Sequence, residues 1–239
     1  MRKTRFIGLL LAVVLAAGCS KEKESTASWN MVSSTGNGKD GASGAWKPKE
    51  EYDAIVTVKQ ADEIIYFQVD SVTRVYPAAG YRDDSYKGPK RLACGLKVYD
   101  YQIYKDWWYS RVTWYENLDE GTLIRNPFAS GINYRSFDVL DDWMTTMEDG
   151  FLTLHYSALW GSAKTPHGMS LVYGEDPWHW TLVHFTVGDD DAQTKVDALI
   201  YFDLNDAIPK TDGAAVTINW TALDGKPAQK TFWFRSRSE

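Results

Sequence analysis

Apolar residues recur at every second position in two short segments near the start of the folded part of the chain. The segments are residues 54–58 and 64–69, and a third short strand pattern follows at residues 72–76. A period of two is typical of a β-strand that buries one face. Glycine, aspartate and proline are concentrated in residues 78–89, which predicts a loop.

The next strand pattern, residues 91–104, changes phase along its length. Apolar positions are even-numbered up to Val98 and odd-numbered from Tyr99 onward. Such a change predicts a β-bulge, which bends the strand. A further strand is predicted at residues 107–115. Several short strands, one of them bulged, predict a small closed barrel of the OB-like type at residues 50–118.

Strand patterns return in the second half of the chain, where glycine- and aspartate-containing turns separate them. Polar and apolar residues alternate most regularly over residues 216–221. The predicted strands are residues 150–160, 168–173, 178–187, 196–204, 214–223 and 229–235. This succession predicts an immunoglobulin-like β-sandwich at residues 136–239. Residues 119–135 lack periodicity and are predicted to be a connector, so the fold class is all-β.

The N-terminus has the features of an export segment. Three basic residues precede the apolar run from Phe6 to Ala17, which is shorter than the roughly 20 residues that span a bilayer. Small residues then lead to Cys19 in the sequence Leu15-Ala16-Ala17-Gly18-Cys19. This pattern predicts a lipoprotein signal peptide at residues 1–18 and a lipid-attached Cys19. The alternative is an ordinary signal peptide followed by a chance cysteine.

The segment after the cleavage site is predicted to be a flexible tether over residues 19–49, because serine, glycine and lysine dominate it. Ser20, rather than aspartate, resembles the sorting pattern of outer-membrane lipoproteins. The sequence leaves open whether the protein faces the periplasm or the cell surface. We expect the N-terminal end of the mature protein to bind the membrane through the lipid on Cys19.

The net charge and the amino-acid composition exclude some classes of function for this protein. Residues 19–239 contain 23 basic and 32 acidic residues, a net charge of −9. A surface this acidic repels phosphate backbones, so no nucleic-acid partner is expected. Cys94 lies among apolar residues and is predicted to be a small core residue rather than a reactive thiol.

No residue set in the sequence compels a catalytic or metal-binding interpretation. His179 and His184 are an odd number of residues apart on one predicted strand, which places them on opposite faces. No glycine-flanked serine or phosphate-binding loop is present. We therefore expect no metal, no cofactor and no enzymatic activity. A glycan-acting hydrolase is the less favoured alternative, since it would require two carboxylates in one cleft.

Aromatic residues are the best indication of a binding surface, because the chain has 11 Trp and 14 Tyr. One face of strand 107–115 presents Trp107, Tyr109, Arg111 and Tyr115, which we predict to form a solvent-facing site for a sugar or a protein. The alternative is packing against another part of the chain. Ser71, in Asp70-Ser71-Val72, matches a short acceptor pattern for O-glycosylation.

The order of these patterns resembles the NigD-like lipoprotein family of Gram-negative gut and mouth anaerobes. The similarity covers most of the mature chain, and the segments that carry it are the lipobox, residues 64–77, residues 150–161, residues 198–204 and Ile208-Pro209. The resemblance implies an N-terminal OB-like barrel, a C-terminal β-sandwich and no established catalytic residues. It also implies an alternative function, which is bacteriocin immunity. The favoured expectation is a non-enzymatic binding module of the cell envelope.

Overall fold

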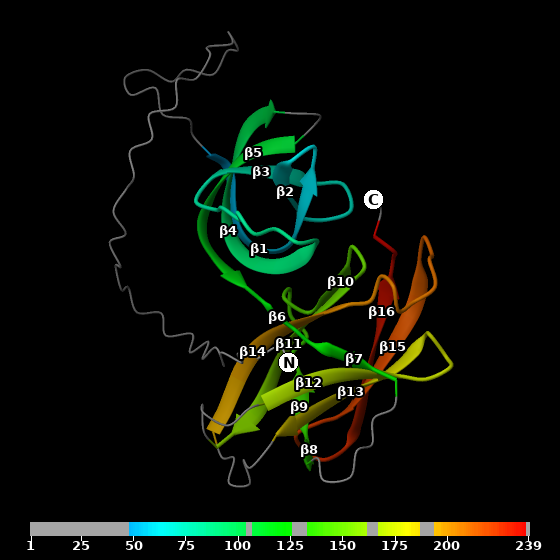
Figure 1. The fold of residues 1–239 in the computed structure, drawn as a ribbon. Helices are drawn as coiled ribbons and strands as arrows, with labels where there is room; N and C mark the ends of the chain where they lie inside the picture. Colours follow the sequence, from blue (N-terminus) through cyan, green and yellow to red (C-terminus); the bar gives the residue numbers. More distant parts are fainter. Residues whose placement is uncertain (1–47, 104–106, 126–132, 162–166, 187–193, 238–239) are drawn as a thin grey trace.

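Two β domains, one stacked on the other, make up the structure of the protein (Figure 1). The computed structural model describes residues 48–103, 107–125, 133–161, 167–186 and 194–237. The predicted signal peptide, Cys19 and nearly all of the predicted tether therefore lie outside the described residues. Within the described ranges, no helix has the length and apolar character needed to cross a bilayer.

The N-terminal domain is a closed five-stranded barrel. Its strands are β1 (Pro48–Ala61), β2 (Ile64–Gln68), β3 (Arg74–Ala79), β4 (Lys90–Ile103) and β5 (Trp107–Asn117). Their order around the barrel is β1-β2-β3-β5-β4, with β3 and β5 parallel and the other pairs antiparallel. This is the Greek-key order of an OB-fold. The predicted fold class is confirmed.

The barrel closes because β4 is bent. The pairing of β4 with β5 shifts register between Val98 and Gln102, where the sequence changes phase, so the predicted bulge is confirmed. Before the bulge, the even-numbered residues point into the barrel and are buried. Cys94 is one of them and is fully buried, as predicted. Burial raises the pKa of its thiol to about 12, with the nearby Asp53 carboxylate adding to the effect. The thiol therefore stays protonated at neutral pH.

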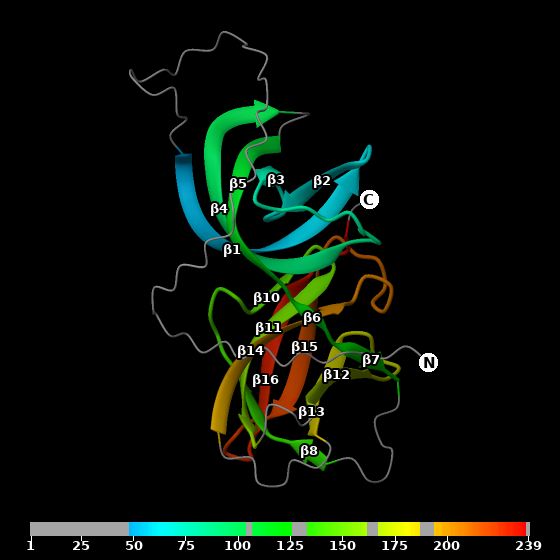
Figure 2. The ribbon, with the colours of Figure 1, turned by 60° about the vertical axis from the view of Figure 1, so that its left-hand side comes forward.

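The C-terminal domain is a sandwich of two sheets (Figure 2). The first sheet contains β10 (Thr146–Glu148), β11 (Phe151–Trp160), β14 (Thr194–Asp203), β6 (Asp119–Glu120) and β9 (Phe137–Val139). The second contains β16 (Pro227–Phe234), β15 (Ala214–Thr221), β13 (His179–Thr186), β12 (His167–Tyr173), β7 (Thr122–Ile124) and β8 (Asn133–Arg135).

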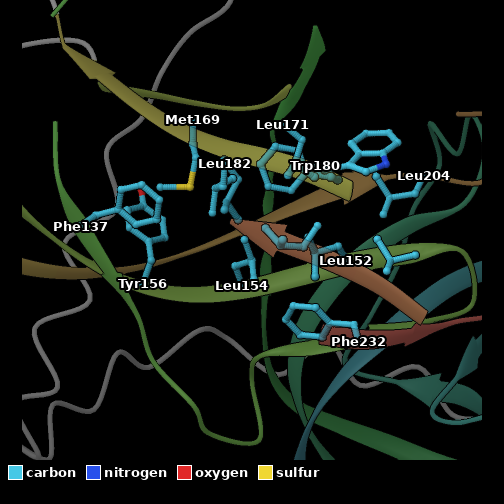
Figure 3. Packing of buried hydrophobic residues seen from close by; sticks show 14 of the residues in the cluster. Phe137, Leu152, Leu154, Tyr156, Met169, Leu171, Trp180, Leu182, Leu204 and Phe232 are labelled. Atoms are coloured by element: carbon cyan, nitrogen blue, oxygen red, sulfur yellow. The ribbon is translucent and has the colours of Figure 1, made fainter. Parts of the chain in front are cut away.

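The sandwich core lies where the inward faces of the two sheets meet. Leu152 and Leu154 from β11 approach Leu171, Trp180 and other apolar side chains of the opposite sheet (Figure 3). Trp180 is fully buried, and its Nε1 donates to the carbonyl of Pro177 at 2.7 Å.

The predicted connector, residues 119–135, differs from the structure. It contains β6, β7 and β8, which belong to the sandwich. β6 pairs in parallel with β14 of the first sheet, and β7 pairs in parallel with β12 of the second. The chain crosses from one sheet to the other at Gly121, whose amide donates to the carbonyl of Tyr201 at 2.7 Å. Strands of two or three residues are too short to show periodicity, and their partners lie far away in the sequence.

The domain junction is built on Arg91 of β4, whose side chain is 1% exposed. Its Nη1 donates to Thr57 Oγ1 within the barrel at 2.8 Å. Its Nε and Nη2 donate to Thr153 Oγ1 and Thr146 Oγ1 of the sandwich, at 3.1 and 3.3 Å. Burial lowers the pKa of Arg91 to about 10, although the Glu148 carboxylate opposes this shift. The guanidinium is therefore charged at neutral pH and joins the two domains.

A second contact at the junction comes from the tight turn between β10 and β11. Asp149 and Gly150 both have positive φ values, 51° and 77°. An Asp-Gly pair accommodates such a two-residue turn, since neither residue is strongly disfavoured there. At its tip, Asp149 Oδ1 accepts from Lys59 Nζ of the barrel at 3.1 Å.

Candidate binding surface

Trp107 does not belong to an exposed surface, so this part of the predicted binding face is wrong. Its side chain is 1% exposed, and its ring stacks on Tyr66 with 4.4 Å between centroids. The neighbouring Trp108 lies on the other face of β5 and packs partly against the barrel core. Alternation separates the two faces of a strand, but it does not show whether the outer face is covered.

Tyr109 and Arg111 do lie on an outer surface of the barrel, where the bulge in β4 brings two more tyrosines beside them. Because Val98 pairs with Ser110 and Gln102 pairs with Trp108, the three residues between them lie opposite Tyr109 alone. Tyr99 and Tyr101 therefore meet the Tyr109 ring edge to face, at centroid distances of 5.7 and 6.2 Å. We call Tyr99, Tyr101, Tyr109 and Arg111 the tyrosine surface.

A groove of about 470 Å³ runs beside the tyrosine surface. It is lined by Pro48, Lys97, Tyr99, Arg111, Val112 and Thr113. Lys97 forms an ion pair with Glu51 at 3.1 Å, whereas Arg111 is exposed to solvent. Partial burial raises the pKa of Tyr109, and the positive charge of Arg111 opposes this shift. The surface thus combines phenol hydroxyls with a guanidinium at the mouth of a groove.

Tyr115 is separated from the tyrosine surface by a second bulge. Leu96 pairs with Val112 but Gly95 pairs with Trp114, so Thr113 is an extra residue in β5. An extra residue inverts the alternation that follows it. Tyr115 therefore shares a face with its partner Cys94 and contacts Tyr81 edge to face at 5.0 Å. Tyr115 keeps the predicted solvent exposure, at 44%, but it does not join Tyr109 and Arg111 in one surface.

The same bulge exposes Trp114, which regular alternation would place on the buried face with Val112. Its side chain is 44% exposed, and Nε1 donates to Asp53 Oδ1 at 3.0 Å. The indole covers Gly95, where a Cβ atom would lie 2.4 Å from Trp114 Nε1. The glycine in β4 therefore lets the displaced indole lie against the outside of the barrel.

Ser71 lies at the exposed tip of the turn between β2 and β3. Asp70 Oδ1 shapes this turn by accepting the backbone amides of Val72 and Thr73, each at 2.8 Å. The burial that raises the pKa of Asp70 is outweighed by these hydrogen bonds, so its pKa is lowered. The position is accessible to a modifying enzyme, and O-glycosylation of Ser71 stays a prediction.

Two histidine contacts join residues that the sequence spacing does not pair. His179 is exposed and His184 is buried, so their predicted placement on opposite faces is confirmed. His184 Nε2 instead meets His167 Nδ1 at 3.0 Å inside the sandwich, where Trp160 stacks on His167. His155 Nδ1 contacts Asp142 Oδ2 at 2.5 Å and fastens the loop before β10 to β11. These partners are distant in sequence, so spacing alone could not pair them.

Comparison with known proteins supports the fold and the family resemblance. Residues 126–234 match the family model of the NigD-like C-terminal beta sandwich domain. No curated protein sequence matches the chain at a significant level.

Solved structures extend the similarity over both domains. A protein from Parabacteroides distasonis, provisionally described as toxin related, has a TM-score of 0.65 at 20% identity, covering 78% of this chain and 94% of that chain. A NigD-like immunity protein from Bacteroides caccae has a TM-score of 0.53 at 16% identity, covering 75% and 91%. A protein from Bacteroides fragilis, provisionally described as a lipoprotein, has a TM-score of 0.53 at 13% identity, covering 80% and 100%.

At sequence identities of 20% or lower, the solved structures show a similar fold and nothing more. The family model adds a match in sequence over the C-terminal part of the chain. The resemblance seen in the sequence is confirmed over residues 126–234, which match the NigD-like C-terminal beta sandwich domain.

Proposed function

We propose that the protein is a non-enzymatic lipoprotein of the outer membrane that binds a protein partner through the tyrosine surface. The lipobox ending at Cys19 supports the anchoring. A structural relative that is provisionally described as a lipoprotein agrees with it. The observation that carries the binding role is the cluster of three tyrosines and Arg111 on one side of the closed barrel.

Several features of the tyrosine surface favour a protein over a sugar. Tyrosine and arginine are enriched among the residues that dominate the energy of protein interfaces. The rings of Tyr99 and Tyr101 flank Tyr109 edge to face, so they restrain its ring. A restrained ring loses little conformational entropy when a partner binds. The exposed guanidinium of Arg111 beside these rings suits an acidic segment of the partner.

Bacteriocin immunity is a second candidate, and the name of the Bacteroides caccae relative favours it. The partner in that case would be a toxin. Deleting the gene should then sensitise the producing cells to a toxin encoded beside it, and unchanged sensitivity would exclude this function. A purified protein that releases reducing sugars from polysaccharides would contradict the non-enzymatic part of the proposal.

Replacing Cys19 by alanine should abolish lipid attachment and release the protein from the membrane fraction. Acyl chains contribute about 0.8 kcal/mol per buried CH₂, so losing them removes the whole anchor. The measurement is incorporation of labelled palmitate, with fractionation of a Gram-negative host. Cys94→Ala is the matched control, because a buried thiol carries no lipid. Palmitate retained in the Cys19→Ala variant would contradict the anchoring.

The double substitution of Tyr109→Ser and Arg111→Glu should weaken partner binding about tenfold or more, the effect expected for central interface residues. Envelope proteins retained by the immobilised wild type are identified by mass spectrometry, and the affinity of each is then measured for both forms. Arg82→Glu is the matched charge control, since the Arg82 side chain is 83% exposed and lies outside the tyrosine surface. Equal retention by the double variant, or no specific retention by the wild type, would refute the role of this surface.

A further inference from the structure

A cleft of about 450 Å³ opens at the domain junction, on another part of the molecule from the tyrosine surface. One wall is the turn between β2 and β3 of the barrel. The other wall combines the turn between β10 and β11 with the C-terminal end of β16, both of which lie beneath the barrel (Figure 2). This volume lies within the range of about 300–1,000 Å³ that small-ligand sites occupy, and such sites are frequent between domains.

Trp233 provides an open aromatic platform in this cleft. It lies on β16, and its side chain is 63% exposed. The indole rests against Gly213, where a Cβ atom would lie 2.6 Å from Trp233 Nε1. The backbone thus supports the ring on one side while most of its surface stays accessible. An indole face held in this way can stack on the apolar C–H face of a sugar ring.

Polar groups of the cleft surround this platform with hydrogen-bonding capacity. Arg74 Nε donates to Gln68 Oε1 at 3.0 Å, and Arg235 Nε donates to the carbonyl of Asp212 at 2.9 Å. Among the described residues, no hydrogen bond engages the Nη atoms of either arginine, so both guanidinium groups are oriented and can still donate. Glu148 is half-exposed and can accept.

The residues that line the cleft carry equal numbers of positive and negative charges, and this balance favours some classes of ligand over others. Its lining contains three arginines and three acidic residues, namely Arg74, Arg91, Arg235, Asp70, Glu148 and Asp149. A phosphate-rich ligand would favour an excess of positive charge, and an acyl chain would favour an apolar lining. Balanced donors and acceptors around an indole suit a ligand rich in hydroxyl groups.

We propose that this cleft binds a saccharide, with one sugar ring stacked on Trp233 and its hydroxyl groups held by Arg74, Arg235 and Glu148. The site uses residues of both domains, so it forms only when the barrel and the sandwich are docked. It goes beyond the proposed protein-binding function, because no residue of the cleft belongs to the tyrosine surface.

The test uses the mature protein on an array of oligosaccharides and polysaccharides, followed by calorimetric titration with the best-bound sugar. Trp233→Ala should weaken binding about tenfold or more, while Trp233→Phe should retain part of it. Trp143→Ala is the matched control, since Trp143 is also exposed but lies outside the cleft. Binding by the Tyr109→Ser, Arg111→Glu variant should equal that of the wild type. No bound sugar at millimolar concentration, or full binding by Trp233→Ala, would overturn the proposal.

Discussion

Replacing Arg91 by alanine should lower the free energy of unfolding by about 3 kcal/mol, because three hydrogen bonds from a buried charge are lost together. Those bonds reach Thr57 in the barrel and Thr146 and Thr153 in the sandwich. Their removal also weakens the docking of the two domains, although the Lys59–Asp149 ion pair remains. Urea denaturation should therefore show the barrel and the sandwich unfolding in separate steps rather than in one.

Two further substitutions at this position separate the charge from the hydrogen bonds. Methionine fills a similar volume to arginine but carries no charge, so the Arg91→Met variant avoids the free-energy cost of burying a charge. Its loss of stability should therefore be smaller than that of the Arg91→Ala variant. Arg91→Lys keeps a buried charge but lacks the planar fork that reaches three hydroxyls. Lysine should therefore destabilise the protein more than methionine. A lysine variant as stable as the wild type would show that the fork geometry contributes nothing.

A side chain at Gly121 should damage the sandwich, and Gly121→Val should cost about 3 kcal/mol of stability. A Cβ atom at this position would lie 2.1 Å from Cε1 of Phe202. Phe202 is fully buried in the sandwich core, so its ring cannot move aside without disturbing its neighbours. The chain passes between the two sheets at this point, so the backbone has little freedom to relax. Thermal unfolding of the variant measures the loss.

Two comparisons test whether the contact with Phe202 is the cause. Gly174→Ala should change stability by less than about 1 kcal/mol, because no atom lies within 4 Å of the place where its Cβ would stand and the backbone there is not left-handed. Combining Gly121→Ala with Phe202→Leu should cost less than the sum of the two single changes, since the smaller side chain relieves the overlap. Strict additivity would mean that Gly121 is needed for another reason.

The candidate site was only partly predictable from the sequence. Alternation placed Tyr109 and Arg111 on the outer side of β5, which the structure bears out. It could not show that Trp107 is covered or that one extra residue at Thr113 moves Tyr115 to a different face of the strand from Tyr109 and Arg111. The bulge at Thr113 in β5 is hard to recognise in the sequence. Gly95, the glycine that accommodates Trp114, lies on the partner strand β4 and not beside the bulge in the sequence.

The sequence by itself determined the all-β class, the bend in β4 and most of the residues that face each core. These properties depend on the local two-residue period and on the positions of turn residues, which neighbouring side chains encode directly. The phase change between Val98 and Tyr99 is a clear case, since the bulge lies where the pattern changes.

Only the tertiary structure decided which outer faces are covered, how the chain crosses at Gly121, and where Arg91 and Trp233 lie. Each of these depends on groups far away in sequence, such as Thr153 for Arg91 and Phe202 for Gly121. From the sequence alone, an arginine at the start of a strand is expected to be exposed to solvent. Arg91 is buried because the second domain supplies hydroxyl acceptors for its guanidinium. The cleft beside Trp233 likewise exists because two separately encoded domains are docked together.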